Sequence, residues 1–556
     1  PRVPRKEIVF DFDLAQITEG LSFHTNMNFD FYNAFDQTVY NTYSVYEPTW
    51  GAGDKITALK QIGTDSRPGT QAVGNTTFRR RMGFFAQLAY DRTFDDVHHF
   101  MGNLVGYHTQ LKIQGTYQPV KTSHLGLQLN YTYDKKYTVD FSGNYASSPK
   151  LAEGHRTGVS PSAALGWVLS RESFLQDVEW LDHLKLRVSA GILKSDIPVT
   201  SFYLYEPAYT TSTTIRWGEG SYNRASYLPS RGANYDLTFA DRKELNVGLE
   251  GTLFNKSLTI DANLFWERYN GQVVRPTAAY PGFYSAFVAY ENFNEDSYRG
   301  FDVGVKYKKN FGDFRFMVGA NALYVDSERK VVDESYAEPY MYRAGHPRDA
   351  YFGYMCEGIF QSQAEIDAAP KQTLGTVKPG DLKYKDLNND GVIDTNDQTY
   401  LGRWNAPLSG GLELNLGYKN WDLYVLGEAQ FGGKGFKENS YYWIDSTDKY
   451  SEIALNSWTE SNKSAEYPRI TTQAGNNNLV RSSFWLYDKD YFQIRKIQLT
   501  YQMPDKIANA MLMKKMSVYL DATTPFRFAS NREVLDLKIG SEMSYRTFSI
   551  GFKSTF

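Results

Sequence analysis

Apolar and polar residues alternate with a period of two along most of the chain. Residues 125–133 place Leu or Tyr at every second position, and residues 137–145 resume the alternation after a polar turn at 134–136. This pattern predicts antiparallel hairpins with one apolar and one polar face. The same hairpin pattern recurs at 245–266, 301–320 and 412–425.

The connections between these predicted strands differ in length at the two ends. We expect about 18 strands of roughly ten residues, with tight turns at one end. Short helical patterns occur only near 172–180, 450–458 and 505–513. Short turns on one side and long loops on the other are typical of outer-membrane barrels. The predicted long connections are 203–240, 268–296, 325–349, 363–406 and 432–489.

The fold class predicted by this pattern is all-β, a transmembrane antiparallel β-barrel that covers residues 1–556 as one domain with long extracellular loops. A soluble β-sandwich or a propeller also alternates. The polar face, however, carries Asn, Gln, Asp, Lys and Gly in strand after strand, as a water-filled lumen requires. A propeller would also show a blade repeat of about 40–50 residues, which the sequence lacks.

Composition narrows the function classes. Aromatic residues make up 16% of the 556 residues, which argues against disorder, and a net charge of −3 gives no reason to expect nucleic acid binding. The single cysteine, Cys356, excludes an intrachain disulfide. The sequence has no run of about 18 apolar residues, so we do not expect a transmembrane helix. No G-x-S-x-G, P-loop or H-E-x-x-H motif is present, so we do not expect an enzyme.

The two ends of the chain also carry information. Phe548, Ile550, Phe552 and Phe556 share one face of the last predicted strand. A terminal strand that ends on an aromatic residue is typical of bacterial outer-membrane barrels. The chain starts at Pro1 without Met or a signal peptide, and we interpret it as a mature or partial chain.

Several segments of the chain together carry a family resemblance. The most specific is the acidic loop GDLKYKDLNNDGVID at 380–394. The other segments are ESFL at 172–175, LKLRVSAG at 184–191, KELNVGLE at 243–250, LNSWT at 455–459, YFQIRKIQLTY at 491–501 and RTFSIGF at 546–552. As a set, from about residue 80 to the C-terminus, they resemble the SusC-like TonB-dependent transporters of Bacteroidetes outer membranes.

The resemblance implies a 22-stranded barrel, an N-terminal plug domain and a TonB box. Residues 5–60 already alternate as strands and no plug-like segment precedes residue 80. We therefore expect this chain to be most of the barrel, with the plug domain not in this chain. A passive outer-membrane porin that lacks a plug is the competing interpretation.

The resemblance also implies a function and partners. It predicts a nutrient importer in the bacterial outer membrane that takes up oligosaccharides or peptides. A SusD-like surface lipoprotein would close over the long loops, and TonB–ExbB–ExbD would act through the missing N-terminal part. The expected environment is outer-membrane lipid, and the expected assembly is a dimer of transporter–lid pairs.

The acidic motif inside the predicted loop 363–406 has the spacing of an EF-hand loop. Positions 1, 3, 5, 7, 9 and 12 of such a loop supply oxygen ligands to Ca²⁺, and Gly391 stands where the loop turns sharply. Position 12 is Asp rather than Glu, and flanking helices are not expected. The alternative is an Asx-rich turn that caps its own backbone without a metal. The predicted structural Ca²⁺ ligands are Asp386, Asn388, Asp390, the Val392 carbonyl, Asp394 and Asp397.

Aromatic residues in the long loops are candidates for stacking on sugars or on peptide side chains. Tyr and Trp combine an apolar ring with a polar group, so they suit a ligand site, an interfacial girdle and ordinary loop packing equally well. The candidates are Tyr203, Tyr205, Trp217, Tyr222, Tyr280, Tyr284, Tyr441, Tyr442 and Trp443.

Overall fold

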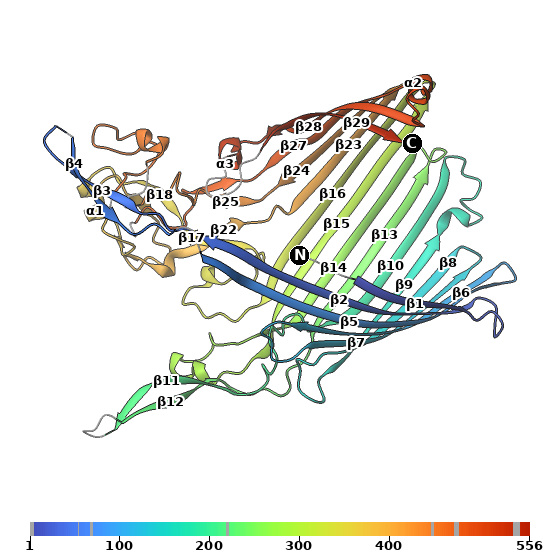
Figure 1. Cartoon of the computed structure of the whole chain (residues 1–556), viewed down its shortest axis with the longest axis horizontal. Helices are drawn as coiled ribbons and strands as arrows, with labels where there is room; N and C mark the ends of the chain where they lie inside the picture. The colour runs from blue at the N-terminus through green and yellow to red at the C-terminus, as the bar shows by residue number, and fades with distance from the viewer. Residues whose placement is uncertain are drawn as a thin grey trace. The chain divides into compact units, whose positions relative to one another are not determined.

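The computed structural model describes residues 5–53, 55–66, 70–217, 222–445, 450–471, 477–536 and 545–555. Within these ranges the regular secondary structure is almost entirely β, and 17 strands belong to one hydrogen-bonded sheet (Figure 1). The chain divides into two compact units, Pro1–Tyr131 with Phe141–Pro161 and Thr132–Asp140 with Ser162–Phe556. None of the helices in the described part of the chain is long and apolar enough to cross a membrane.

The first unit is built from long antiparallel strands. β2 (Leu21–Tyr40) pairs with β1 (Arg5–Asp13) on one side and with β5 (Thr70–Phe94) on the other. The strands confirm the expectation that residues 5–60 are β-structure. The remaining strands of this part are β3 (Val45–Trp50), β4 (Ile56–Ile62) and β6 (His98–Ile113), followed by β7 (Val120–Tyr133), β8 (Tyr137–Ser147) and β9 (Thr157–Val168), whose residues are divided between the two units.

The second unit contains an antiparallel sheet in which sequence neighbours are also hydrogen-bonded neighbours. Its strands reach 21 residues in β15, about twice the length that a membrane crossing needs. The longest strands therefore extend beyond the bilayer. The strands are β10 (Leu181–Ser195), β13 (Ala240–Leu253), β14 (Leu258–Val274), β15 (Glu291–Phe311), β16 (Phe314–Val331), β23 (Leu408–Tyr418), β24 (Trp421–Phe431), β27 (Tyr491–Gln502), β28 (Lys515–Phe528) and β29 (Thr547–Thr555).

Turns and long connections alternate in this unit as predicted. β13 and β14 are joined by a tight turn in which Asn255 has φ 57°, and β23 and β24 by a turn with Lys419 at φ 50°. The opposite ends carry the long connections. The predicted loops 325–349 and 363–406 are one connection, residues 332–407, because its apolar residues pack in a local core and do not form a membrane-crossing strand.

Short elements fill the connections. The pattern near 505–513 forms a helix, the one near 450–458 forms a 3-10 helix, and 172–180 forms turns after a 3-10 segment. The helices are α1 (Gln363–Ala368), α2 (Asp505–Ala510), α3 (Arg532–Asp536), η1 (Leu169–Arg171), η2 (Gly282–Phe287), η3 (Pro339–Met341), η4 (Thr395–Asp397) and η5 (Glu452–Asn456). The short strands are β11 (Ala208–Trp217), β12 (Tyr222–Arg231), β17 (Ala350–Tyr354), β18 (Cys356–Ile359), β19 (Lys371–Gln372), β20 (Leu382–Tyr384), β21 (Val392–Ile393), β22 (Gln398–Arg403), β25 (Lys434–Phe436) and β26 (Leu486–Asp488).

The two faces of the second unit's sheet differ in chemistry. The register aligns Val247, Leu264, Phe301 and Tyr324 in one row across four strands. Directly opposed residues share a face, and we call this one the apolar face. Its side chains are exposed, with Leu264 at 48% and Phe301 at 38%. A continuous exposed apolar face of this extent needs a non-aqueous surrounding, which lipid provides.

The opposite face, here called the polar face, holds charged networks. The Arg187 guanidinium donates to Glu250 Oε1 at 2.5 Å and to Asn263 Oδ1 at 2.6 Å. Asn263 in turn donates to Asp302 Oδ1 at 2.8 Å. These residues come from strands β10, β13, β14 and β15. The alternation of the sequence therefore separates an apolar from a hydrated face.

Candidate functional site

The largest buried core lies in the long connections and not in the sheet. Connection 332–407 contributes Tyr354, Leu382, Tyr384 and Ile393 to it. Connection 432–490 contributes Tyr442, Ile444, Ile453 and Trp485, and Trp485 is 1% exposed. Burial of this many apolar side chains stabilises the two connections as one unit, which we call the loop core. The long-loop end is therefore a defined platform.

A buried ion pair ties the two connections together. The Asp381 carboxylate is 1% exposed, and Arg469 lies with Nε 2.8 Å from Oδ1 and donates from Nη2 to Oδ2 at 2.9 Å. Asn478 donates to Asp381 Oδ1 at 2.8 Å, and the Lys378 amide donates to Oδ2 at 2.7 Å. Oδ2 thus accepts from a charged and a neutral donor, while Oδ1 accepts from Asn478 and lies beside the Arg469 guanidinium. The buried charge is compensated, as it must be.

Amide side chains extend this network to the acidic motif. Gln372 donates to Asn477 Oδ1 at 2.7 Å and accepts from the Tyr384 amide at 2.7 Å. The Tyr384 hydroxyl donates to the Asn477 carbonyl at 2.8 Å. Burial raises the pKa of Tyr384 well above its usual value. The conspicuous GDLKY stretch therefore serves to anchor the loop core.

The acidic loop that follows is built from Asx turns. Asp386 accepts from the Asn389 amide at 2.7 Å and from the Gly391 amide at 2.9 Å. Asn388 Oδ1 accepts from the Asp390 amide at 3.1 Å, and Asp390 Oδ1 from the Val392 amide at 2.8 Å. Asn389 has φ 60° and Gly391 has φ 83°, the left-handed conformations that this tight path needs.

The last carboxylate of the motif, Asp397, accepts hydrogen bonds from backbone amides. Asp397 is fully buried and accepts from the Leu387 amide at 2.8 Å and the Asp394 amide at 2.9 Å. Asp394 accepts from the Asn396 amide at 2.7 Å. In the described residues no group of three or more His, Cys, Asp or Glu side chains is placed to hold a metal ion. The arrangement is the self-capped turn that the sequence left open as the alternative, and Ca²⁺ binding stays a prediction.

A tyrosine from the neighbouring segment closes over this loop. The Tyr340 hydroxyl donates to the Asn396 carbonyl at 2.8 Å. Burial and then the carboxylates of Glu338, Asp397, Asp386 and Asp390 raise the pKa of Tyr340 to about 12. The acidic loop is therefore close enough to Tyr340 for its carboxylates to add to the effect of burial.

The aromatic candidates fall into three groups. Tyr205 and Tyr442 are 6% exposed and contribute to packing, and Tyr441 and Trp443 pack partly against the loop core. Tyr203, Tyr280 and Tyr284 are at least 40% exposed, and the Tyr280 and Tyr284 rings lie 5.6 Å apart. The side chains of Trp217 and Tyr222 lie outside the described residues. Ligand contact by any of the nine stays a prediction.

Sequence reasoning missed the residues that order the loop core. Arg469, Asn477 and Asn478 lie 88 to 97 residues beyond Asp381 or Leu382, to which they bond. A local pattern contains no information on such distant partners. One residue could have pointed to a distant partner. Asp381 is a carboxylate between the turn residue Gly380 and the apolar Leu382, in a stretch that is otherwise buried.

The chain is similar to receptors and transporters of one kind. TonB-dependent receptor P26 of Formosa agariphila is 25% identical over 418 residues, 71% of this chain and 40% of that protein. TonB-dependent receptor SusC of Bacteroides thetaiotaomicron is 20% identical over 403 residues, 67% of this chain and 37% of that protein. No family model matches the chain.

Solved structures show the same fold. The RagAB peptide transporter superimposes with a TM-score of 0.70 at 16% identity, over 96% of this chain and 60% of that one. The open-open state of the RagAB peptide importer gives a TM-score of 0.72 at 16% identity, over all of this chain and 62% of that one. In sequence the chain is thus similar to part of the SusC-type TonB-dependent receptors, and in fold it matches the barrel of the RagAB transporter.

The match confirms several expectations. The fold is an outer-membrane β-barrel of the TonB-dependent transporter type, and the relatives are receptors and transporters rather than enzymes. The chain spans about 40% of the length of the curated relatives it matches, P26 and SusC.

Proposed function

We propose that this SusC/RagA-type barrel belongs to a TonB-dependent importer of oligosaccharides or peptides. The observation that carries the proposal is the fold match with the RagAB peptide transporter over 96% of the chain. Sequence similarity to TonB-dependent receptors over 71% of the chain supports it. Energy from TonB–ExbB–ExbD would reach the barrel through the N-terminal part of the longer receptor.

A SusD-like surface lipoprotein is the partner we propose for the long-loop end. The loop core gives that end a rigid platform, because it joins two connections through buried apolar residues and the Asp381–Arg469 pair. Exposed aromatic rings stand on a third connection, where Phe283 is 85% and Phe287 53% exposed. A rigid base with exposed aromatic anchors suits a protein lid.

Uptake in whole cells tests import directly. The full-length receptor is expressed with its lid protein, and accumulation of labelled oligosaccharide and peptide pools is followed with and without a protonophore. We expect one pool to accumulate and its accumulation to stop when the proton gradient is removed. Pulldown of the receptor in mild detergent should recover a lipidated partner.

Passive diffusion through a porin is the second candidate function, and the same experiment separates it. Diffusion needs no energy, so uptake that continues unchanged with the protonophore, or in cells without TonB, would favour the porin. A deletion of the receptor gene gives the background. The two pools also decide between sugar and peptide as the substrate class.

A further inference from the structure

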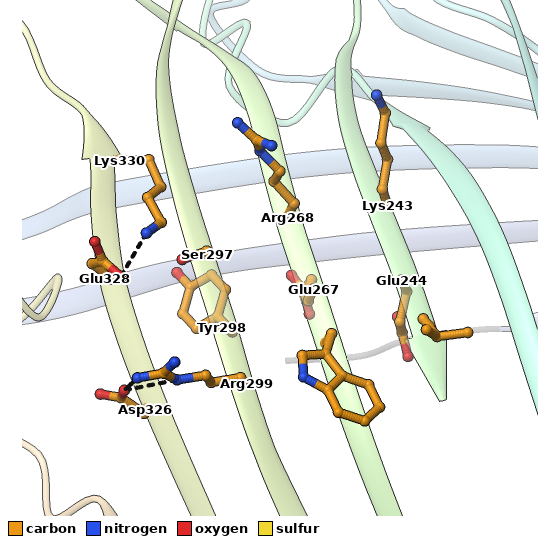
Figure 2. Close-up of a pocket in the computed structure, with 12 residues that line it drawn as sticks. Lys243, Glu244, Glu267, Arg268, Ser297, Tyr298, Arg299, Asp326, Glu328 and Lys330 are labelled. Atoms are coloured by element: carbon orange, nitrogen blue, oxygen red, sulfur yellow. Dashed lines mark hydrogen bonds and ion pairs between the residues drawn. The ribbon is translucent and has the colours of Figure 1, made fainter. Parts of the chain in front are cut away.

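A pocket opens on strands β13, β14, β15 and β16 near the long-loop end of the second unit (Figure 2). Its volume is about 410 Å³, in the range of small organic ligands rather than of a single ion. Its charged lining consists of four cations and four carboxylates: Lys243, Arg268, Arg299, Lys330, Glu244, Glu267, Asp326 and Glu328.

The strand register places these cations on the apolar face. Leu245, Trp266, Arg299 and Asp326 are directly opposed across the four strands. Two residues farther along each strand, Lys243, Arg268, Ser297 and Glu328 form the next row on the same face. Glu244 and Glu267 also line the pocket, but they pair with Arg242 in the alternate, polar-face register.

The pocket lies at one border of the apolar band. From Leu245 to Leu253 every second residue of β13 is apolar or Gly, and Leu258 to Trp266 mirrors this on β14. Nine residues of strand rise about 27 Å, or roughly 20 Å of height at a 35–45° tilt, close to the ~25 Å of an outer-membrane apolar band. Trp266, which is 45% exposed, stands where an interfacial aromatic girdle is expected.

The cations are accessible to a ligand. Arg268 pairs with Glu295 at 2.5 Å and Arg299 with Asp326 at 2.9 Å, yet their side chains are 61% and 70% exposed. Lys330 lies 2.7 Å from Glu328. Lys243 makes no ion pair within the described residues. Exposed pairs contribute at most about 1 kcal/mol, so a stronger anionic ligand can replace them.

We propose that this pocket binds the headgroup of a phosphorylated glycolipid of the outer leaflet. Lys243, Arg268 and Arg299 would bind phosphate, for which the planar guanidinium is well suited. Asp326 and Glu328 would accept hydrogen bonds from sugar hydroxyl groups, and the acyl chains would lie on the apolar face below Trp266. Clustered Lys and Arg side chains at a membrane interface are a recognised type of lipid headgroup site. The inference rests on the outer-membrane location of the barrel and not on the proposed import.

Lipid binding to the full-length receptor in detergent tests this proposal. The probes are a phosphorylated, acylated glucosamine disaccharide, its dephosphorylated form, phosphatidylethanolamine and inorganic phosphate, with adducts counted by native mass spectrometry. We expect the phosphorylated glycolipid to bind at least about tenfold more tightly than the other two lipids, and inorganic phosphate not to displace it. Equal binding of the dephosphorylated form or of phosphatidylethanolamine would overturn the assignment, and so would full displacement by phosphate.

Variants locate the site. The triple variant Lys243→Gln, Arg268→Gln and Arg299→Gln is expected to lose at least about tenfold in affinity. The matched control is Lys306→Gln, Arg315→Gln and Arg495→Gln, which removes the same charge from polar-face pairs with Glu413, Asp422 and Glu428. Equal loss in both variants would contradict the pocket assignment. The comparison of lipid probes on the unchanged receptor decides the chemistry even where a variant folds poorly.

Discussion

At the residue scale, the most consequential side chains are those that the loop core buries. Asp381 joins the two connections through an ion pair in which its carboxylate is 1% exposed and the Arg469 side chain 17% exposed. Cys356 packs against the same core, and burial raises the pKa of its thiol to about 11. The acidic loop beside them concentrates carboxylates. The ion pair, the buried thiol and the acidic loop can each be tested by experiment.

Substitution of Asp381 by Ala is expected to open the loop core. The change leaves Arg469 buried without its partner, which costs about 3–5 kcal/mol for such pairs. Limited proteolysis should cut within 332–407 or 432–490 much faster than in the unchanged receptor, while the barrel stays intact. Glu438→Ala removes an exposed partner of Arg481 and is the control, with at most about 1 kcal/mol expected. Equal protease resistance in the two variants would show that the buried pair contributes little.

The Cys356 thiol is expected to react slowly with alkylating reagents. The thiolate is the reactive form, and a pKa of about 11 in place of 9.0 reduces its fraction at pH 8 by roughly a hundredfold. Because the thiol has a higher pKa in the folded than in the unfolded chain, its contribution to folding stability is full below pH 9. That contribution is lost as the pH rises from 9 toward 11. Labelling followed by mass spectrometry across this range should show the rise; rapid labelling at pH 7 would contradict it. The Asp381→Ala variant should label faster.

The predicted Ca²⁺ site gives a simple metal test. Asp386 and Asp390 occupy positions 1 and 5 of the loop, and the double variant Asp386→Ala, Asp390→Ala is expected to abolish Ca²⁺ uptake. Elemental analysis after dialysis against Ca²⁺ measures it. Asp367→Ala, on the exposed helix α1, is the control. Unchanged Ca²⁺ content in the double variant would contradict the predicted site and show that the motif is an Asx turn without a metal.

At the element scale, the strands were predictable and the connections were not. Period-two alternation located the strands because lipid and water impose opposite demands on alternate residues, as in 412–418. Connection 332–407 was split in the prediction between the loops 325–349 and 363–406. Residues 350–354 do form a strand, β17, but it pairs with β22 inside the connection, and Tyr354 also bridges to the distant Ser482. The acidic motif was visible, but its anchoring by Asn477 and Asn478 depends on contacts that only the fold brings together.

The alternation predicts which of two adjacent residues tolerates a charge. Leu414 lies in the apolar-face register with Val318 and Val425, whereas Asn415 lies in the alternate register with Tyr424. Leu414→Arg is expected to destabilise the barrel by about 2–4 kcal/mol, because the charge meets lipid near the middle of the band. Asn415→Arg should cost under about 1 kcal/mol. Urea unfolding of the receptor in bilayers measures both, and equal costs would contradict the assignment of the faces.

At the scale of the whole molecule, we propose that this chain forms the wall of an importer. An apolar face for lipid, a polar face for water and a rigid long-loop platform are what this chain supplies. The resemblance implies that a plug in the longer receptor fills the lumen, which distinguishes an energised importer from a diffusion pore. Substrate identity is not carried by the barrel pattern, because loops vary on a fixed scaffold.

The ionic conductance of the full-length receptor in planar lipid bilayers tests the central claim most directly. An importer that opens only under the pull of TonB is expected to be closed, so the membrane current should stay at its baseline after insertion is verified. Stable, large, ohmic openings of the unchanged receptor would contradict this account and identify the protein as a passive porin.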